Sequence, residues 1–276
     1  MKKFLLSAPY LAFMILFILV PVILVFGYGV TVVDDAGGVS FSLSNFKAFF
    51  TNQIYVEVFF RSLYLAAIAT VICLILGYPV GLILASRRFR KNNLLILLIV
   101  IPMWMNLLLR TYAWLTLLEN TGLVNSLLAF FGLPTHEFLY SESAIVLGMV
   151  YNFLPFMILP IYSTMLKMDY SLVEAAQDLG ANSFDTFRKI IFPFSLGGVF
   201  TGITMVFMPA VTTFAISSIL SGRKIYLIGN LIEDVFISTF DWHFGSTIAI
   251  ILIVIILLSM AVTSRYEKEN SGGGLF

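Results

Sequence analysis

The side chains that most often carry catalysis or bind metals are few in this chain and lie apart from one another. Its two histidines, His136 and His243, stand alone, and its one cysteine, Cys73, lies within a long apolar run. A single cysteine forms no internal disulfide, and the sequence contains no GxxxxGK[ST], GxSxG or HExxH motif. We therefore expect no catalytic residue, no metal site, no cofactor, no nucleic-acid partner and no ATP bound through a phosphate loop.

Arg110 is the one charged residue deep inside an apolar run, and Tyr112 and Trp114 follow it closely. A charged side chain in such a position is costly and is often functional. If the run were one straight helix, 1.5 Å per residue would place Arg110 roughly 24 Å from its inner edge. Two interpretations remain: Arg110 extends its charge to the outer interface, or it lines a path or gate with the two aromatic rings, which can bind cations.

A second polar group follows Pro209, within the fifth apolar run. A proline removes one helix hydrogen bond and clashes with the preceding turn. A break at membrane depth is tolerated where it lines a cavity. Thr213 and Ser217 then either hydrogen-bond a passing solute or bond their own backbone in a kinked, packed helix.

Glu233 and Asp234 belong to the polar face of a further predicted helix. Its apolar face comprises Leu227, Ile228, Leu231, Ile232, Val235 and Phe236. Such a helix lies on the outer interface, or it is a gate element or a platform for an external protein.

The segment 167–192 is a polar interlude between two apolar runs. Ser171 and Glu174 have the spacing of a capping box. Ala175 and Ala176 continue this short helix with small side chains. Gly180 then predicts a turn with positive φ.

A second short helix is expected after this turn, beginning at Asn182 or Ser183. Phe184 and Phe187 are predicted to share its apolar face and to fix it against the membrane. Pro193 is expected near the start of the next apolar run, where a missing N–H costs little. A flexible connector needs none of these features, so we expect a docking element.

The composition indicates a membrane protein of one domain, 1–276. The chain is 60% hydrophobic and 11% charged, whereas soluble domains average about 25% charged residues. Six apolar runs are long enough to cross a bilayer as helices, and their continuous apolarity argues against a β-barrel. The predicted fold class is therefore an all-α polytopic membrane protein with spans at 10–33, 62–86, 92–118, 143–166, 193–222 and 244–264.

The distribution of Lys and Arg predicts the orientation. If the N-terminus is inside, eleven of these residues lie on the inner side and five on the outer side. Cytoplasmic loops carry the excess of positive charge, so both termini are expected in the cytoplasm. The first run, which follows Lys2 and Lys3, is longer than a signal-peptide core and is interpreted as a span.

The segment EAAQDLGANSFDTFRKIIFP, from Glu174 to Pro193, resembles the EAA loop of ABC importer permeases. Glu174, Ala175, Ala176, Gly180 and Pro193 fall on the motif. In that family the loop forms coupling helices that dock into a groove on the ATPase subunit. The resemblance implies a type I permease-like fold and an ATPase located in a partner.

Further stretches resemble the spermidine/putrescine permease subgroup, closest to the first of its two paired permeases. They include VEVFFRSLYLAAIATVICLILGYPVGLILA, IPMWMNLLLRTYAWLTLLENTGLVNSLL and YLIGNLIEDVF. The resemblance implies polyamine import into the cytoplasm, with Glu233 and Asp234 as the candidate acids for the cationic solute. It also implies a second permease subunit, two copies of a cytoplasmic ABC ATPase and an extracytoplasmic substrate-binding protein as partners, within the lipid bilayer of the cell membrane. Many relatives carry an acidic residue after the proline of the fifth span, but none occurs in 209–222.

Three classes of function fit six spans to different degrees. An ATP-coupled permease for polyamines or another small solute is favoured by the uncharged spans and the 174–193 segment. A self-contained carrier or channel would often keep acids within its spans, and no span contains one. A membrane-bound enzyme is disfavoured by the missing catalytic groups.

Overall fold

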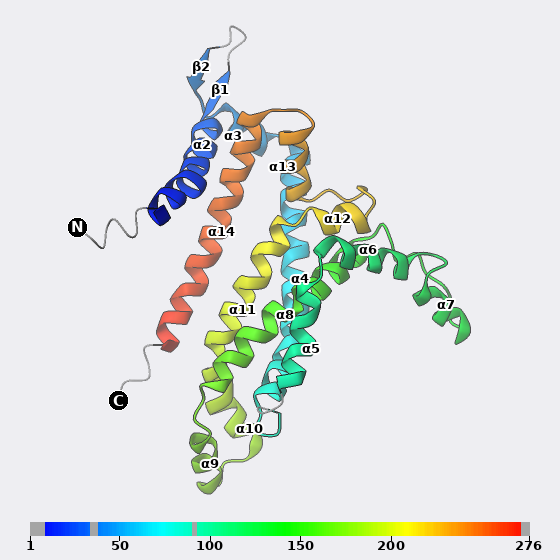
Figure 1. Cartoon of the computed structure of the whole chain (residues 1–276), viewed down its shortest axis with the longest axis vertical. Helices are drawn as coiled ribbons and strands as arrows, with labels where there is room; N and C mark the ends of the chain where they lie inside the picture. Colours follow the sequence, from blue (N-terminus) through cyan, green and yellow to red (C-terminus); the bar gives the residue numbers. More distant parts are fainter. Residues whose placement is uncertain (1–8, 34–37, 90–92, 272–276) are drawn as a thin grey trace, which may run out of the picture. The chain divides into compact units, whose positions relative to one another are not determined.

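The structure is a computed structural model that describes residues 9–33, 38–89 and 93–271 (Figure 1). Most of these residues are helical, which confirms the expected all-α class. The chain divides into two compact units, Met1–Phe60 with Gly229–Leu257 and Arg61–Ile228 with Leu258–Phe276.

Among the described residues, five helices are long and apolar enough to cross a membrane. They are Pro9–Gly29, Gln53–Ala85, Glu142–Leu166, Ser183–Thr212 and Trp242–Ala261. A sixth span results if the bent pair Leu94–Trp104 and Leu107–Phe130 is counted as one crossing. The chain is thus a multi-pass membrane protein.

The first unit joins the N-terminal segment to part of the C-terminal helix. Its elements are η1 (Ile15–Leu19), α2 (Val20–Gly29), β1 (Thr31–Val33), β2 (Val39–Phe41), α3 (Ser44–Thr51), the start of α4 (Gln53–Ala85), most of α13 (Ile228–Ile237) and the start of α14 (Trp242–Ser271). The Thr247 hydroxyl of α14 donates to the Gly29 carbonyl over 2.9 Å. A side chain at Gly29 would collide with Ile250, so the glycine permits close packing of these helices.

The two strands form a small antiparallel hairpin that the sequence analysis did not predict. Thr31 lies opposite Phe41, and Val33 lies opposite Val39. β-branched residues favour extended backbone. The three residues of β1 are β-branched, but they lie at the end of the apolar run 10–33, which was interpreted as a helical span.

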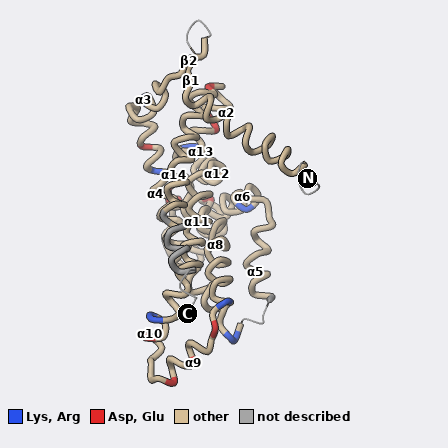
Figure 2. The backbone as a smooth tube through the Cα atoms, turned by 90° about the vertical axis from the view of Figure 1, so that its left-hand side faces the viewer, with Lys and Arg blue, Asp and Glu red and all other residues tan. Residues whose placement is uncertain are grey.

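Apart from Glu233 and Asp234, the candidate functional residues belong to the second unit. Its elements are the rest of α4, α5 (Asn93–Trp104), α6 (Leu107–Leu118), α7 (Leu123–Phe130), α8 (Glu142–Leu166), α9 (Ser171–Asp178), α10 (Ser183–Thr186), η2 (Phe187–Ile191), α11 (Phe192–Thr212), α12 (Ala215–Leu220) and the last part of α14. In Figure 2 charged residues lie around α9 and α10, whereas the middle of α8 is uncharged.

Two pairs of glycines bring α4 and α11 into close contact with α8. Gly198 and Gly202 of α11 lie against the backbone of α8 around Met157 and Ile161. Gly77 and Gly81 of α4 lie against the same two side chains. Small residues four apart let membrane helices approach closely, so α4, α8 and α11 form one tightly packed group.

The expected third span, 92–118, is not one helix, and residue 92 lies outside the described residues. Helix α5 ends at Trp104, and the chain bends by 93° before α6. Pro102 weakens the end of α5, and the Asn106 side chain accepts from the Leu108 N–H over 2.8 Å, which begins a new helix. The depth predicted for Arg110 assumed one straight helix and is therefore wrong. The twelve residues of α5 rise only about 18 Å before the bend.

The expected fifth span, 193–222, is shifted toward the N-terminus. Helical structure is continuous from Ser183 to Thr212, and α12 is a separate short helix. A π turn, η2, ends two residues before Pro193. The hydrogen bonds of a π turn join residues five apart and give the backbone a wider turn, which relieves the clash between the proline and the preceding turn. The helix therefore passes through Pro193 instead of starting there. The turn η1 has the same relation to Pro21.

Candidate functional site

The turn between α9 and α10 has the geometry that the sequence predicted. Gly180 has φ +84°. The Ala181 N–H donates to the Ala176 carbonyl and the Gly180 N–H to the Gln177 carbonyl, each over 2.9 Å. This is a Schellman motif, which fixes the direction in which the chain leaves α9. Asn182 then caps the second helix by accepting from the Asp185 N–H over 2.7 Å.

The predicted capping box at the start of α9 is wrong. Tyr170 is the N-cap residue, and its side chain makes no capping hydrogen bond. Asp169 takes this role, because its Oδ1 accepts from the Ser171 N–H over 3.0 Å. Hydrogen bonds from the backbone and then the side chain of Ser171 hold the pKa of Asp169 below its usual value.

Glu174 is held by contacts within the second unit. Its carboxylate lies 2.7 Å from the Arg87 guanidinium, just after α4, and this guanidinium also stacks 4.4 Å from the centre of the Tyr170 ring. The contacts bring the end of α4 to the segment that follows α8, so both helices end at the same face of this unit. The sequence analysis did not connect Arg87 or Tyr170 with this loop, although Arg87 is one of the eleven basic residues expected on the inner side.

Phe187, the first residue of η2, attaches the segment after α10 to α4. Its ring packs edge-on against Tyr78, whose centre is 6.3 Å away. The Tyr78 hydroxyl donates to Ser195 Oγ over 3.0 Å, since the Ser195 hydroxyl itself donates to the Phe192 carbonyl. Phe184 was expected on the same face as Phe187, but it is 67% exposed. Phe184 belongs to α10, whereas Phe187 is the first residue of the π turn η2.

The loop presents an exposed apolar surface at the end of the unit. Leu179 is 89% exposed, Leu172 is 53% exposed, and Phe184 and Ala175 are exposed beside them. Ala176 is half-buried. We call the exposed residues Leu172, Ala175, Leu179 and Phe184 the coupling surface. An apolar surface on a segment rimmed by charges indicates a protein interaction site.

Arg110 is buried within the second unit, with 7% of its surface exposed. Within the described part of the chain, its Nε and Nη1 have no hydrogen-bond partner. An arginine that extended to an interface would expose its guanidinium. The buried position of Arg110 disagrees with the interpretation in which its charge extends to the outer interface. That Arg110 lines a path or gate stays a prediction.

The two aromatic residues near Arg110 face different surroundings. Trp114, one helical turn later, packs edge-on against Tyr151 of α8 with ring centres 5.3 Å apart. Tyr112 is 54% exposed. Residues two apart lie on opposite sides of a helix, so α6 does not gather all three side chains.

Thr213 follows α11 at the break before α12, and Ser217 lies within α12. Thr213 has an extended backbone and is 9% exposed. Ser217 is fully buried, and its hydroxyl donates to the Phe214 carbonyl over 2.9 Å. Ser217 thus bonds the backbone of its own segment, which is the second of the two alternatives given for it. Pro209 is inside α11, which continues for three residues beyond it.

Glu233 and Asp234 are half-buried residues of α13 and belong to the first unit. The predicted apolar face of this helix is packed, since Leu227, Ile228 and Val235 are buried. The Ile228 N–H donates to the buried Ser62 hydroxyl over 2.7 Å. The start of α13 is thus anchored within the protein.

Comparison with known proteins identifies the class. Residues 77–268 match the family of binding-protein-dependent transport system inner membrane components, and the chain belongs to this family. The matched range includes the coupling loop, α8 and α11.

Curated relatives are similar over most of the chain. The spermidine/putrescine transport system permease protein PotB of Haemophilus influenzae is 36% identical over 261 residues, which cover 93% of this chain and 91% of the relative. PotB of Escherichia coli K12 is 36% identical, with 92% and 94% covered. The inner membrane ABC transporter permease protein YdcU of the same organism is 27% identical, with 81% and 75% covered.

Solved structures confirm the fold. A chain of a bacterial ABC transporter involved in the import of the acidic polysaccharide alginate superimposes with a TM-score of 0.74, 17% identity and 96% of each chain covered. The same type of transporter in complex with an alginate-bound periplasmic protein gives a TM-score of 0.75. The chain therefore has the fold of an ABC importer permease.

Proposed function

We propose that the chain imports polyamines, spermidine or putrescine, as the permease subunit of an ATP-driven transporter. The observation that carries the substrate class is the 36% identity to PotB proteins over more than nine-tenths of the chain. ATP hydrolysis takes place in a partner, because the chain has no phosphate loop.

The coupling surface is the docking site for that ATPase. It is apolar and exposed, and a Schellman turn gives it a fixed shape. Behind it, Phe187 packs on Tyr78 and Glu174 pairs with Arg87. A displacement of the surface by the closing ATPase is therefore transmitted to α4 and α11 as the movement of one body.

The proposed topology has six crossings and both termini in the cytoplasm. Arg87 after α4 contacts Glu174 in the segment after α8, so α4 and α8 end on the same side of the membrane. Between them the chain must return to the other side before α8 begins. The bent pair α5 and α6 makes this return crossing, and the excess of basic residues places the coupling loop inside.

The partners follow from this arrangement. They are a second permease subunit, two ATPase copies and an extracytoplasmic binding protein, as expected for a binding-protein-dependent importer. Arg110 and Thr213, beside the broken helices α5–α6 and α11–α12, are the proposed path-lining residues of this unit. Discontinuous helices at depth are typical of substrate paths in transporters.

Uptake of labelled spermidine into cells with and without the complex tests the substrate. We expect saturable uptake only in cells that contain the assembled complex. Equal uptake in both, with the complex present in the membrane, would exclude polyamines and favour another small solute.

A further inference from the structure

A cavity of about 440 Å³ opens at the end of α8 that is far from the coupling loop. Its wall includes Glu119 and Asn120 after α6, Glu137 and Tyr140 before α8, and Lys224 after α12. All belong to the second unit. Small-molecule sites in proteins have volumes of about 300–1,000 Å³, so the cavity is large enough for a small organic ligand.

The cavity already holds an alkylammonium group, supplied by the chain itself. Lys224 Nζ lies 4.3 Å from the centre of the Tyr140 ring. This is the geometry of a cation–π interaction. A lysine side chain is a primary amine on a four-carbon chain, which is the chemistry of one end of a polyamine.

The fold holds the Tyr140 ring in place. The Tyr140 N–H donates to the Leu220 carbonyl over 3.0 Å. Gly222 passes so close that a side chain there would come within 2.8 Å of the ring. The ring is thus supported from the side of α12, while half of its residue surface stays exposed.

Two carboxylates give the cavity a negative wall. Glu119 and Glu137 both line it, and among the described residues neither forms an ion pair. Lys224 is the one basic residue in this wall. An aromatic face together with acids attracts an organic cation.

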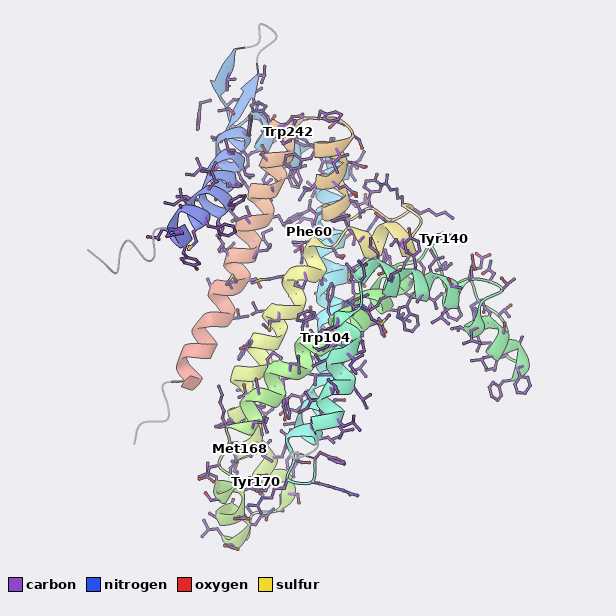
Figure 3. All side chains as sticks on the ribbon, viewed as in Figure 1. Phe60, Trp104, Tyr140, Met168, Tyr170 and Trp242 are labelled. Atoms are coloured by element: carbon purple, nitrogen blue, oxygen red, sulfur yellow. The ribbon has the colours of Figure 1, made fainter. Side chains whose placement is uncertain are left out.

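The cavity also lies where an imported solute would arrive. Tyr140 precedes α8 and Tyr170 follows it, and Figure 3 shows the two residues far apart in the second unit. The 25 residues of α8 span about 37 Å, enough to cross the hydrocarbon core. The cavity and the coupling loop are therefore on opposite membrane faces.

We propose that the Tyr140 cavity is an ammonium-binding site that receives one end of a polyamine, and that Lys224 occupies it when no ligand is bound. The ligand's ammonium group replaces the lysine on the ring, and Glu119 and Glu137 attract its positive charge. The identity of the ligand as a polyamine rests on the proposed function. The preference for an organic cation rests on the cavity alone.

Equilibrium binding of labelled spermidine to the assembled complex in nanodiscs, without the external binding protein, tests the site. Tyr140→Leu removes the ring and should raise Kd about three- to tenfold. Tyr140→Phe keeps an aromatic face and should stay within about twofold of wild type. Lys224→Met removes the internal competitor and should lower Kd severalfold. The double variant Glu119→Gln, Glu137→Gln should weaken binding and reduce its dependence on salt.

The results separate this site from the transport function. The site is wrong if spermidine does not bind, or if Tyr140→Leu, Lys224→Met and the glutamine pair all bind as wild type does. Lys224, Glu119 and Glu137 are exposed, so substitutions there should leave the fold intact. Their variants therefore test the site even if Tyr140→Leu fails to fold. If binding follows the predicted order but cells show no spermidine uptake, the site stands and the proposed substrate of transport fails.

Discussion

Arg110 holds a charge in a buried position, where unpartnered N–H groups lower the stability of the chain. A buried donor without an acceptor costs about 1–3 kcal/mol, and more when it is charged. Its Nε and Nη1 have no acceptor within the described part of the chain. We expect this charge to contact the solute or the second permease in the assembled transporter.

Replacing Arg110 by methionine should therefore separate stability from transport. The apolar side chain fits a buried site, so the unfolding temperature of the purified chain should rise, by the equivalent of about 1–3 kcal/mol. Spermidine uptake by the complex should fall about tenfold or more. Arg110→Lys keeps the charge but not the planar guanidinium, so its spermidine uptake should lie between that of wild type and that of Arg110→Met. Wild-type uptake by Arg110→Met would show that the charge has no part in transport.

At the residue scale, the sequence identified the turn but not its attachments. Gly180 and Asn182 have roles that depend on local backbone geometry, so their types alone predicted them. Glu174 was paired with Ser171 for the same local reason, yet it binds Arg87, which is remote in sequence. A tertiary contact of this kind leaves no periodic signal.

At the scale of elements, Gly180 sets the angle between α9 and α10. A Cβ added at this position meets no neighbouring atom, so we expect valine to cost mainly backbone strain, about 1–2 kcal/mol. We expect Gly180→Val to insert normally but to co-purify with less ATPase and lose substrate-stimulated hydrolysis. Gly180→Asn is the matched control, because asparagine accepts positive φ. Normal ATPase binding by Gly180→Val would mean that the loop is a simple connector.

The packing of α11 on α8 gives a second prediction at this scale. A Cβ at Gly198 would lie 2.7 Å from the Pro160 carbonyl oxygen and 2.9 Å from Ile161 Cα, which are backbone atoms that cannot move aside. Gly198→Ala should lower the free energy of unfolding by about 1–3 kcal/mol. At the adjacent Gly197 the added methyl meets nothing, so Gly197→Ala should be neutral or slightly stabilising. Thermal unfolding of the two variants in detergent compares them, and equal midpoints would refute the tight contact.

Hydrophobic runs predicted where helices exist but not where they break. The run 92–118 is apolar throughout except for Arg110, and apolarity alone does not distinguish one crossing from a bent pair. Pro102 and the capping Asn106 were the available signals. The start of the fifth span was misplaced because the π turn before Pro193 lets a helix continue through a proline.

For the whole molecule, the account predicts which loops are accessible from each side. In a Cys73→Ala background, Asn92→Cys should react with an impermeant maleimide only in inside-out vesicles. Glu137→Cys should react in intact cells. The prediction rests on the charge bias and on the contact between Arg87, just after α4, and Glu174 of the loop after α8. Labelling of residue 92 from outside would contradict the topology.

The central claim is that ATP hydrolysis by a partner drives polyamine import through this permease. Accumulation of labelled spermidine in proteoliposomes tests it most directly. The complex is reconstituted with ATP in the lumen and the binding protein outside. We predict accumulation above the external concentration with ATP, and none with a non-hydrolysable analogue. Equal entry of spermidine with and without hydrolysis would contradict the account and indicate a self-contained carrier or channel.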